Sequence, residues 1–178
     1  SEVYADRIRR APLIGNPGCY PTSVLLPLIP LVRNGLVSTA NLVADAKSGV
    51  SGAGRGLSLA THFCEVSESF KPYKVTQHPH NPEMDEHLGL AAGYPVHITF
   101  VPHLVPMSRG MLTTIYARLE VGIDGNLIQD CLSYAYKNRR FVRLCGPDRL
   151  PDTRHVRGTN YCDIGFRIDE NNRRVILV

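Results

Sequence analysis

The apolar stretch SVLLPLIPLVRN, at residues 23–34, limits the possible folds most strongly. It carries apolar side chains on nearly every side, and a helix of that kind is stable only when other elements surround it. Gly35 is suited to the C-terminal end of such a helix. Pro27 and Pro30 lie inside the stretch, and each removes a backbone donor. We therefore expect a buried helix that is kinked or broken into turns.

Several later segments have the β-branched composition of strands. We expect strands at residues 41–47, 96–101, 111–120 and 141–145, and a hairpin of residues 163–168 with 174–178. Asp124 can cap a helix that runs to about Arg139. The strands cluster instead of alternating with helices, so the expected fold class is α+β, with a mixed or antiparallel sheet and helices on one face. The length of 178 residues suits one domain.

Charge and hydropathy argue against two classes of partner. The net charge is only +4, and no stripe of basic and aromatic residues indicates a nucleic-acid partner. The sequence has no run of about 18 apolar residues that would span a membrane, and SEVYADRIRR at its start lacks an apolar signal core. We expect a cytoplasmic protein, or a piece of one, and a small anionic substrate would suit its charge.

The cysteines are the first candidates for chemistry. They are five in number and lack a C-x-x-C pair, which indicates free thiols. Cys64, Cys131, Cys145 and Cys162 lie within helix or strand patterns and are expected to pack. Cys19, in GCYPT, precedes the apolar helix, and the unpaired N–H groups and positive dipole end of a helix favour a thiolate. From spacing alone, Cys19 is either a nucleophile or a buried packing residue.

The stretch QHPHNPE brings two histidines and a carboxylate together. In extended backbone, His78 and His80 would point to the same face. One imidazole suits general acid–base chemistry near neutral pH, and Glu83 would orient it or hold a substrate. A purely structural pair of histidines is one alternative. A zinc site that adds His62 and Cys64 is another, although the spacing differs from that of zinc fingers.

Two further stretches offer anion-binding groups. In SGVSGAGR, residues 48–55, successive backbone N–H groups would form an anion nest, and Arg55 adds a forked donor. An ordinary flexible loop is the alternative. In VPMSRG, Ser108 and Arg109 lie between two strands, where they would clamp a carboxylate or simply be solvated. No G-x-G-x-x-G follows a strand and opens a helix, so the sequence shows no dinucleotide-binding unit.

Taken in order, the motifs GCYPT, SGxSGAGR, HxHxPE and VPxSRG resemble those of one family. The chain resembles the catalytic and dimerisation domain of N-acetyl-gamma-glutamyl-phosphate reductases over essentially its whole length. The resemblance implies a fold like the catalytic domain of glyceraldehyde-3-phosphate dehydrogenase. It also implies NADPH-dependent reduction of N-acetyl-L-glutamyl 5-phosphate to the semialdehyde, with release of phosphate, in arginine biosynthesis.

The same resemblance implies roles for individual residues. It puts the nucleophile, which would form a thioester, on Cys19 and the acid–base histidine on His78. Gly52 and Gly54 would face the NADP cofactor, and no metal is implied. Residues in the matching motifs would line the substrate: Ser48, Ser51, Gly52, Arg55, His80, Glu83, Ser108 and Arg109.

The family carries an NADP-binding Rossmann domain before this segment and a closing segment after it, and this sequence contains neither. We therefore expect residues 1–178 alone to bind NADPH poorly and not to turn over. The family also suggests a homo-oligomer, a dimer or tetramer built on the sheet.

Three alternative functions stay open at this point. A related reductase would act on aspartyl phosphate, or on a carrier-bound glutamyl or aminoadipyl phosphate. A Cys/His hydrolase would need no cofactor. A metal-binding or purely interacting module would use the same side chains without catalysis.

Overall fold

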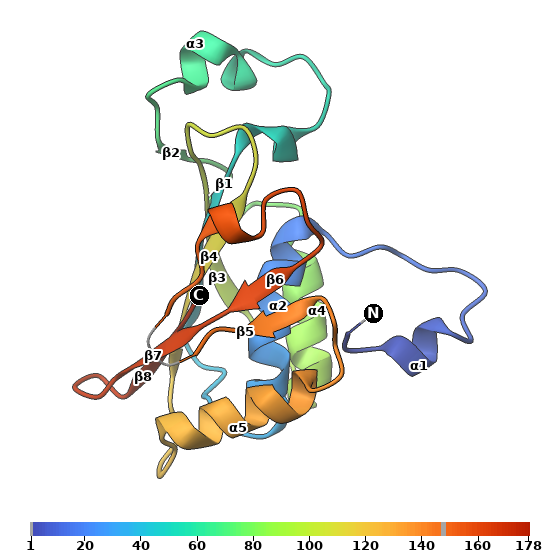
Figure 1. Cartoon of the computed structure of the whole chain (residues 1–178), viewed down its shortest axis with the longest axis vertical. Coiled ribbons are helices and arrows are strands. Elements are labelled where there is room, and N and C mark those ends of the chain that lie inside the picture. Colours follow the sequence, from blue (N-terminus) through green and yellow to red (C-terminus); the bar gives the residue numbers. More distant parts are fainter. Residues whose placement is uncertain (1, 147–148) are drawn as a thin grey trace.

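The structure is a computed structural model that describes residues 2–146 and 149–178. One sheet of six strands forms its centre, and three helices pack beside that sheet (Figure 1). In sheet order, the strands are β2 (Lys71–Pro72), β3 (Ile98–Leu104), β1 (Leu42–Ser48), β4 (Met111–Arg118), β8 (Arg174–Leu177) and β7 (Phe166–Asp169). The β1–β3 pair is parallel and the other pairs are antiparallel, so the sheet is mixed, as expected.

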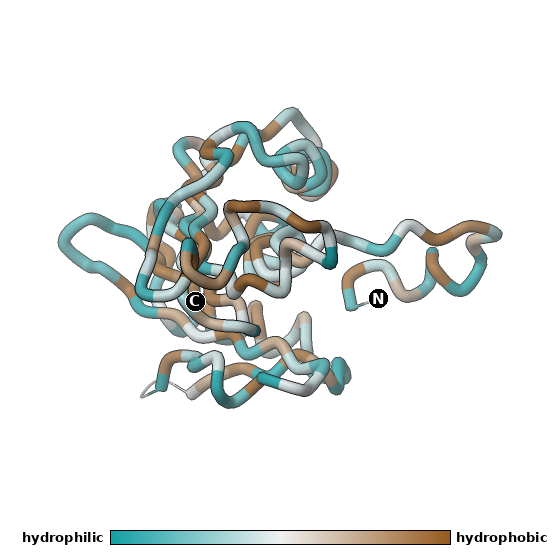
Figure 2. The backbone as a smooth tube through the Cα atoms, turned by 90° about the horizontal axis from the view of Figure 1, so that it is seen from above, coloured by the Kyte–Doolittle hydropathy of each residue, from teal (hydrophilic) through white to brown (hydrophobic). Residues whose placement is uncertain are grey.

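The helices beside the sheet are α2 (Cys19–Arg33), α4 (Asn81–Ala92) and α5 (Gly125–Tyr136). A second, parallel pair of short strands consists of β5 (Val142–Leu144) and β6 (Cys162–Ile164). The short helices are α1 (Ala5–Ile8) and α3 (Phe63–Val66), with 3-10 turns η1 (Val50–Ala53), η2 (Leu59–Thr61) and η3 (Thr153–His155). The segment with α3 stands off from the body in Figure 1, and the N-terminal segment with α1 does so in Figures 1 and 2.

Helix α2 is the buried centre that its composition predicts. Val24, Leu28 and Leu31 have no exposed surface, because α4 and α5 cover the helix on its sides. Its C-terminal end is a Schellman motif, in which Gly35 adopts φ +63° and donates its N–H to Val32, while Leu36 donates to Leu31.

The internal prolines do not break α2 into turns. Pro30 has no N–H to donate to the carbonyl of Leu26, one turn earlier in the helix. The hydroxyl of Tyr136, on α5, donates to that carbonyl instead. A side chain from a neighbouring helix therefore replaces the lost backbone bond, which keeps a buried carbonyl satisfied.

Most expected strands, the α5 helix and its Asp124 cap, and the β7–β8 hairpin are confirmed. Two other elements differ from what the sequence predicted. Helix α4 was missed, since only Met84 and Leu88 are buried along it and its apolar periodicity is weak. The single strand expected at residues 163–168 is divided at Gly165 between β6 and β7.

The packing role expected for Cys64 is also wrong, because that residue is exposed on α3. Cys145 is buried, and Cys131 and Cys162 are half-buried against the core. No helix in the described part of the chain is long and apolar enough to cross a membrane.

We predict that Tyr136→Phe lowers the free energy of unfolding by about 1–3 kcal/mol, because it leaves the buried carbonyl of Leu26 without a donor. Urea denaturation measures the loss. The control is the same substitution in a Pro30→Ala background, where residue 30 regains an N–H for that carbonyl. A loss of equal size in both backgrounds would show that the proline and the tyrosine are not linked.

Candidate active site

Cys19 is the first residue of α2, and its side chain is exposed. The expected helix start at Ser23 was therefore four residues too late. The backbone N–H groups of Cys19 and Tyr20 donate to no group in the described part of the chain. They are the unpaired donors that every helix start carries, and they lie directly beside the thiol. The thiol thus lies beside donors that can stabilise negative charge on an adjacent oxygen.

Helix α4 holds the residue that precedes this cysteine. The backbone N–H of Gly18 donates to both carboxylate oxygens of Glu83, at 3.2 and 3.3 Å. A Cβ on Gly18 would lie 2.6 Å from Nε2 of His80, so only glycine lets that imidazole approach so closely. Glu83 and His80 therefore fix the turn that presents Cys19. The φ of Gly18 is −65°, which any residue can adopt. Glycine is therefore required there for close packing and not for its backbone conformation.

His78 and His80 lie in the turn that precedes α4, and not in the extended backbone that we expected. The centroids of the two imidazole rings are 4.8 Å apart. His78 is buried among the rings of Tyr20, Tyr73 and Phe100. Burial lowers the pKa of His78 to about 4, and the charges of His80 and Lys74 act in the same direction.

The tautomer of His78 follows from one hydrogen bond. Nδ1 of His78 accepts the backbone N–H of His80 at 3.1 Å. A neutral imidazole that accepts at Nδ1 carries its proton on Nε2. His78 is therefore neutral at neutral pH and offers a donor at Nε2. His80 is half-buried, and its own Nδ1 is buried without a partner among the described atoms.

A cavity of about 720 Å³ opens beside Cys19. One wall is the start of α2, and a second is the turn with Arg109 and the beginning of β4. The third wall is the segment from η3 to β6, including Arg157, Asn160 and Tyr161. No sequence motif had singled out this third segment. Its signal was a cluster of polar residues, RGTNY, just before a strand.

The glycine-rich loop after β1 does not form the expected anion nest. The N–H groups of Gly49, Val50 and Ser51 donate to carbonyls of the loop that carries Arg109, and those of Gly52 and Gly54 donate within the glycine-rich loop. Ser48 is buried, and its hydroxyl donates to the carbonyl of Gly49. The loop therefore positions its neighbour rather than presenting free donors.

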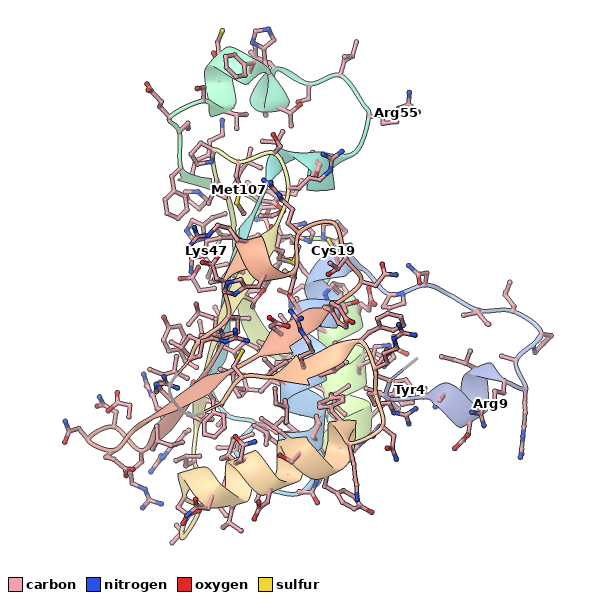
Figure 3. All side chains as sticks on the ribbon, in the orientation of Figure 1. Tyr4, Arg9, Cys19, Lys47, Arg55 and Met107 are labelled. Atoms are coloured by element: carbon pink, nitrogen blue, oxygen red, sulfur yellow. The ribbon has the colours of Figure 1, made fainter. Side chains whose placement is uncertain are left out.

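The remaining site residues from the sequence divide into two groups. Arg109 lines the cavity with Cys19, and Ser108 is exposed next to it. Arg55 is exposed on the loop that leads towards α3 and lies well away from Cys19 (Figure 3). Among the described residues, no three His, Cys, Asp or Glu side chains gather closely enough to hold a metal ion.

The fold and site are those of an α+β domain that presents a thiol from the start of its central helix. The sequence model of the family "Semialdehyde dehydrogenase, dimerisation domain" matches residues 19–178. The chain belongs to this family.

Two relatives, both called N-acetyl-gamma-glutamyl-phosphate reductase, come from Desulforapulum autotrophicum (58% identical) and Syntrophobacter fumaroxidans (52% identical). Each alignment covers 99% of this chain and 51% of the relative, so the chain spans about half the length of these curated relatives. Among solved structures, aspartate semialdehyde dehydrogenase II from Vibrio cholerae superposes with a TM-score of 0.73 at 18% identity. That match covers 99% of this chain and 59% of the other, and it confirms the expected glyceraldehyde-3-phosphate-dehydrogenase-like fold class.

We predict that Gly18→Ala destabilises the chain by about 1–3 kcal/mol, because the added methyl group overlaps the His80 ring. Urea denaturation of the single variant and of the pair Gly18→Ala with His80→Ala measures this. The pair should show little further loss beyond His80→Ala alone. An equal cost of Gly18→Ala in both backgrounds would mean that His80 is not the obstacle.

The low pKa of His78 gives a second prediction, about stability and pH. Between pH 6.5 and about 4, the unfolded chain binds a proton at this residue that the folded chain does not. The free energy of unfolding therefore falls as pH drops through that window, and this group contributes nothing to the pH dependence above it. His78→Asn should flatten the fall in denaturation experiments, whereas His155→Asn, at an exposed position, should not. An unchanged slope in His78→Asn would contradict the assignment.

Proposed function

We propose that this chain is the catalytic part of an N-acetyl-gamma-glutamyl-phosphate reductase, with Cys19 as the nucleophile. The observation that carries the proposal is an exposed thiol at the first position of α2, beside two unpaired N–H groups and a cavity with arginine in its walls. The names of relatives up to 58% identical support the substrate, N-acetyl-L-glutamyl 5-phosphate.

The chemistry on Cys19 has two stages. The thiolate adds to the acyl carbonyl and the C–O bond to phosphate breaks, which leaves a thioester and inorganic phosphate. A hydride then adds to the thioester carbon, and the resulting thiohemiacetal collapses to the aldehyde and returns the thiolate. The N–H groups of Cys19 and Tyr20 would stabilise the negative oxygen in both stages, a contribution of about 3–4 kcal/mol for a donor of this kind.

His78 would supply the acid–base group in this proposal. Its neutral ring would offer Nε2–H to the oxygen of the adduct on Cys19. His80 is a rival for this role, because its ring is in contact with Gly18. The two are distinguished by comparing the pH profiles of kcat for His78→Asn and His80→Asn.

NADPH would supply the hydride. The chain fits such a cofactor at one end only, where the cavity gives room beside Cys19. The resemblance to the family would also place Gly52 and Gly54, on the exposed glycine-rich loop, along the cofactor. Its nucleotide would be bound by the half of the relatives' length that this chain does not span.

We propose the cytoplasm as the location of the protein.

A homo-oligomer is also part of the proposal. The family is described as a dimerisation domain. The sheet face away from the helices carries half-exposed Val43, Tyr116 and Ile176 side by side on β1, β4 and β8. A second copy would cover this row.

The test uses a protein of the relatives' full length that contains this chain. NADPH absorbance is followed with N-acetyl-L-glutamyl 5-phosphate. We expect oxidation by the wild type and a loss of about 10⁴-fold or more in Cys19→Ser, as for other nucleophile substitutions. Cys64→Ser, at another exposed cysteine, is the matched control and should keep full activity. No oxidation by the folded wild type, but reduction of aspartyl phosphate or a carrier-bound acyl phosphate, would transfer the proposal to that substrate.

A further inference from the structure

The cavity beside Cys19 is lined by two arginines that have no carboxylate partner among the described residues. Arg109 lines one wall and Arg157 another. Neither side chain has an ion-pair or hydrogen-bond partner among the described residues. Guanidinium groups bind carboxylates and phosphates through paired hydrogen bonds. The cavity walls therefore offer two unpaired cationic residues to an anionic ligand.

The acidic residues of the same cavity are already paired with other arginines. Asp163 accepts two bonds from Arg143, at 2.6 and 2.9 Å, and its side chain is only 2% exposed. Asp152 accepts from the backbone N–H of Arg154 at 2.9 Å and from its guanidinium group at 3.0 and 3.2 Å, and these bonds lower the pKa of the carboxyl group. The carboxylates therefore do not compete for Arg109 and Arg157.

The segment from Val156 to Tyr161, here called the Arg157 turn, is held by its own hydrogen bonds. The hydroxyl of Thr159 donates to the carbonyl of Val156 at 2.7 Å and accepts the N–H of Tyr161 at 3.1 Å. The N–H of Arg157 donates to the carbonyl of Thr153 at 3.1 Å. Because this backbone is already fixed, less conformational entropy is lost when the Arg157 side chain becomes ordered around a ligand.

The two arginine-bearing turns lie against each other. A Cβ on Gly110 would lie 3.3 Å from Cβ of Thr153, and the φ of Gly110 is +126°. Glycine at this position lets the turn with Arg109 approach the segment that leads to Arg157. The two backbone segments that carry the arginines are thus held together by packing.

We infer that Arg157 binds the α-carboxylate of the substrate and selects for it, while Arg109 faces the phosphate. This inference rests on the proposed function. In an N-acetylglutamyl substrate, the carboxylate and the acetamide share one carbon, so they need a cation and a neutral polar partner side by side. The Arg157 turn offers both, because Asn160 and Tyr161 line the same wall. The wall with Arg109 continues into Met111 and Leu112, which offer no such side-chain partner, and then into Thr113, whose hydroxyl is already hydrogen-bonded to Ser23.

The experiment compares two acyl phosphates with the full-length protein. One is N-acetyl-L-glutamyl 5-phosphate, and the other is 4-acetamidobutanoyl phosphate, which lacks only the α-carboxylate. We expect the wild type to prefer the first by about 10²-fold or more in kcat/KM, the usual size for a charged hydrogen-bonded pair. Arg157→Met should lose that preference by slowing only the first substrate. Arg157→Lys should recover about 10-fold of the loss, and Arg10→Met, at an exposed arginine of the N-terminal segment, should match the wild type.

Calorimetric titration gives a second measurement that needs no turnover. N-acetyl-L-glutamate should bind the wild type more tightly than 4-acetamidobutanoate does, and Arg157→Met should remove the difference. Thermal melts show that each variant is folded, and Arg157→Lys serves if Arg157→Met is not.

The outcomes separate the inference from the proposed function. Equal slowing of both acyl phosphates by Arg157→Met, or a selective effect of Arg109→Met instead, would overturn the assignment of Arg157 while reductase activity stands. A wild type that reduces neither compound but binds N-acetyl-L-glutamate through Arg157 would refute the reductase and keep the carboxylate site. Binding that ignores Arg157 would overturn the inference directly.

Discussion

The contact between Gly18 and helix α4 is the constraint on which the site depends. The His80 ring occupies the space where any other residue would place a Cβ, and Glu83 accepts the Gly18 N–H. The start of α2 is thereby tied to a helix about sixty residues further along the chain. Cys19 follows at once, so its position relative to the two histidines is set by packing and not by the flexibility of a loop.

The rest of α2 must be rigid for this tie to matter. Its two internal prolines remove donors, but the helix stays whole because Tyr136 of α5 satisfies the carbonyl that Pro30 leaves free. Ser23 is hydrogen-bonded at 2.8 Å to Thr113 of β4, which ties the helix to the sheet near the cavity. Cys19 is thus presented by an element fixed against α4, α5 and the central sheet.

The same packing determines which groups near the site are neutral and which charged groups are paired. Burial among aromatic rings keeps His78 neutral, with its proton on Nε2. Two arginines on the outside of the cavity pair with its two aspartates. Around Cys19 there remain two unpaired backbone N–H groups, in a cavity that is also lined by two arginines without carboxylate partners among the described residues. Such surroundings suit a substrate that is anionic and becomes more so at its reacting oxygen.

The sequence by itself determined the features that depend on neighbours in the chain. A helix end at Gly35, a cap at Asp124, the β-branched strands and the place of Cys19 near a helix start all follow from local backbone preferences. The sequence did not predict helix α4, because only two of its residues are buried and its apolar periodicity is therefore weak. Tertiary structure decided the rest. N–H groups of the glycine-rich loop donate to carbonyls of the loop with Arg109. Arg157, which lies far along the chain from Cys19, lines the same cavity as that cysteine. Both outcomes depend on contacts between segments distant in sequence, and no local pattern encodes which segments will meet.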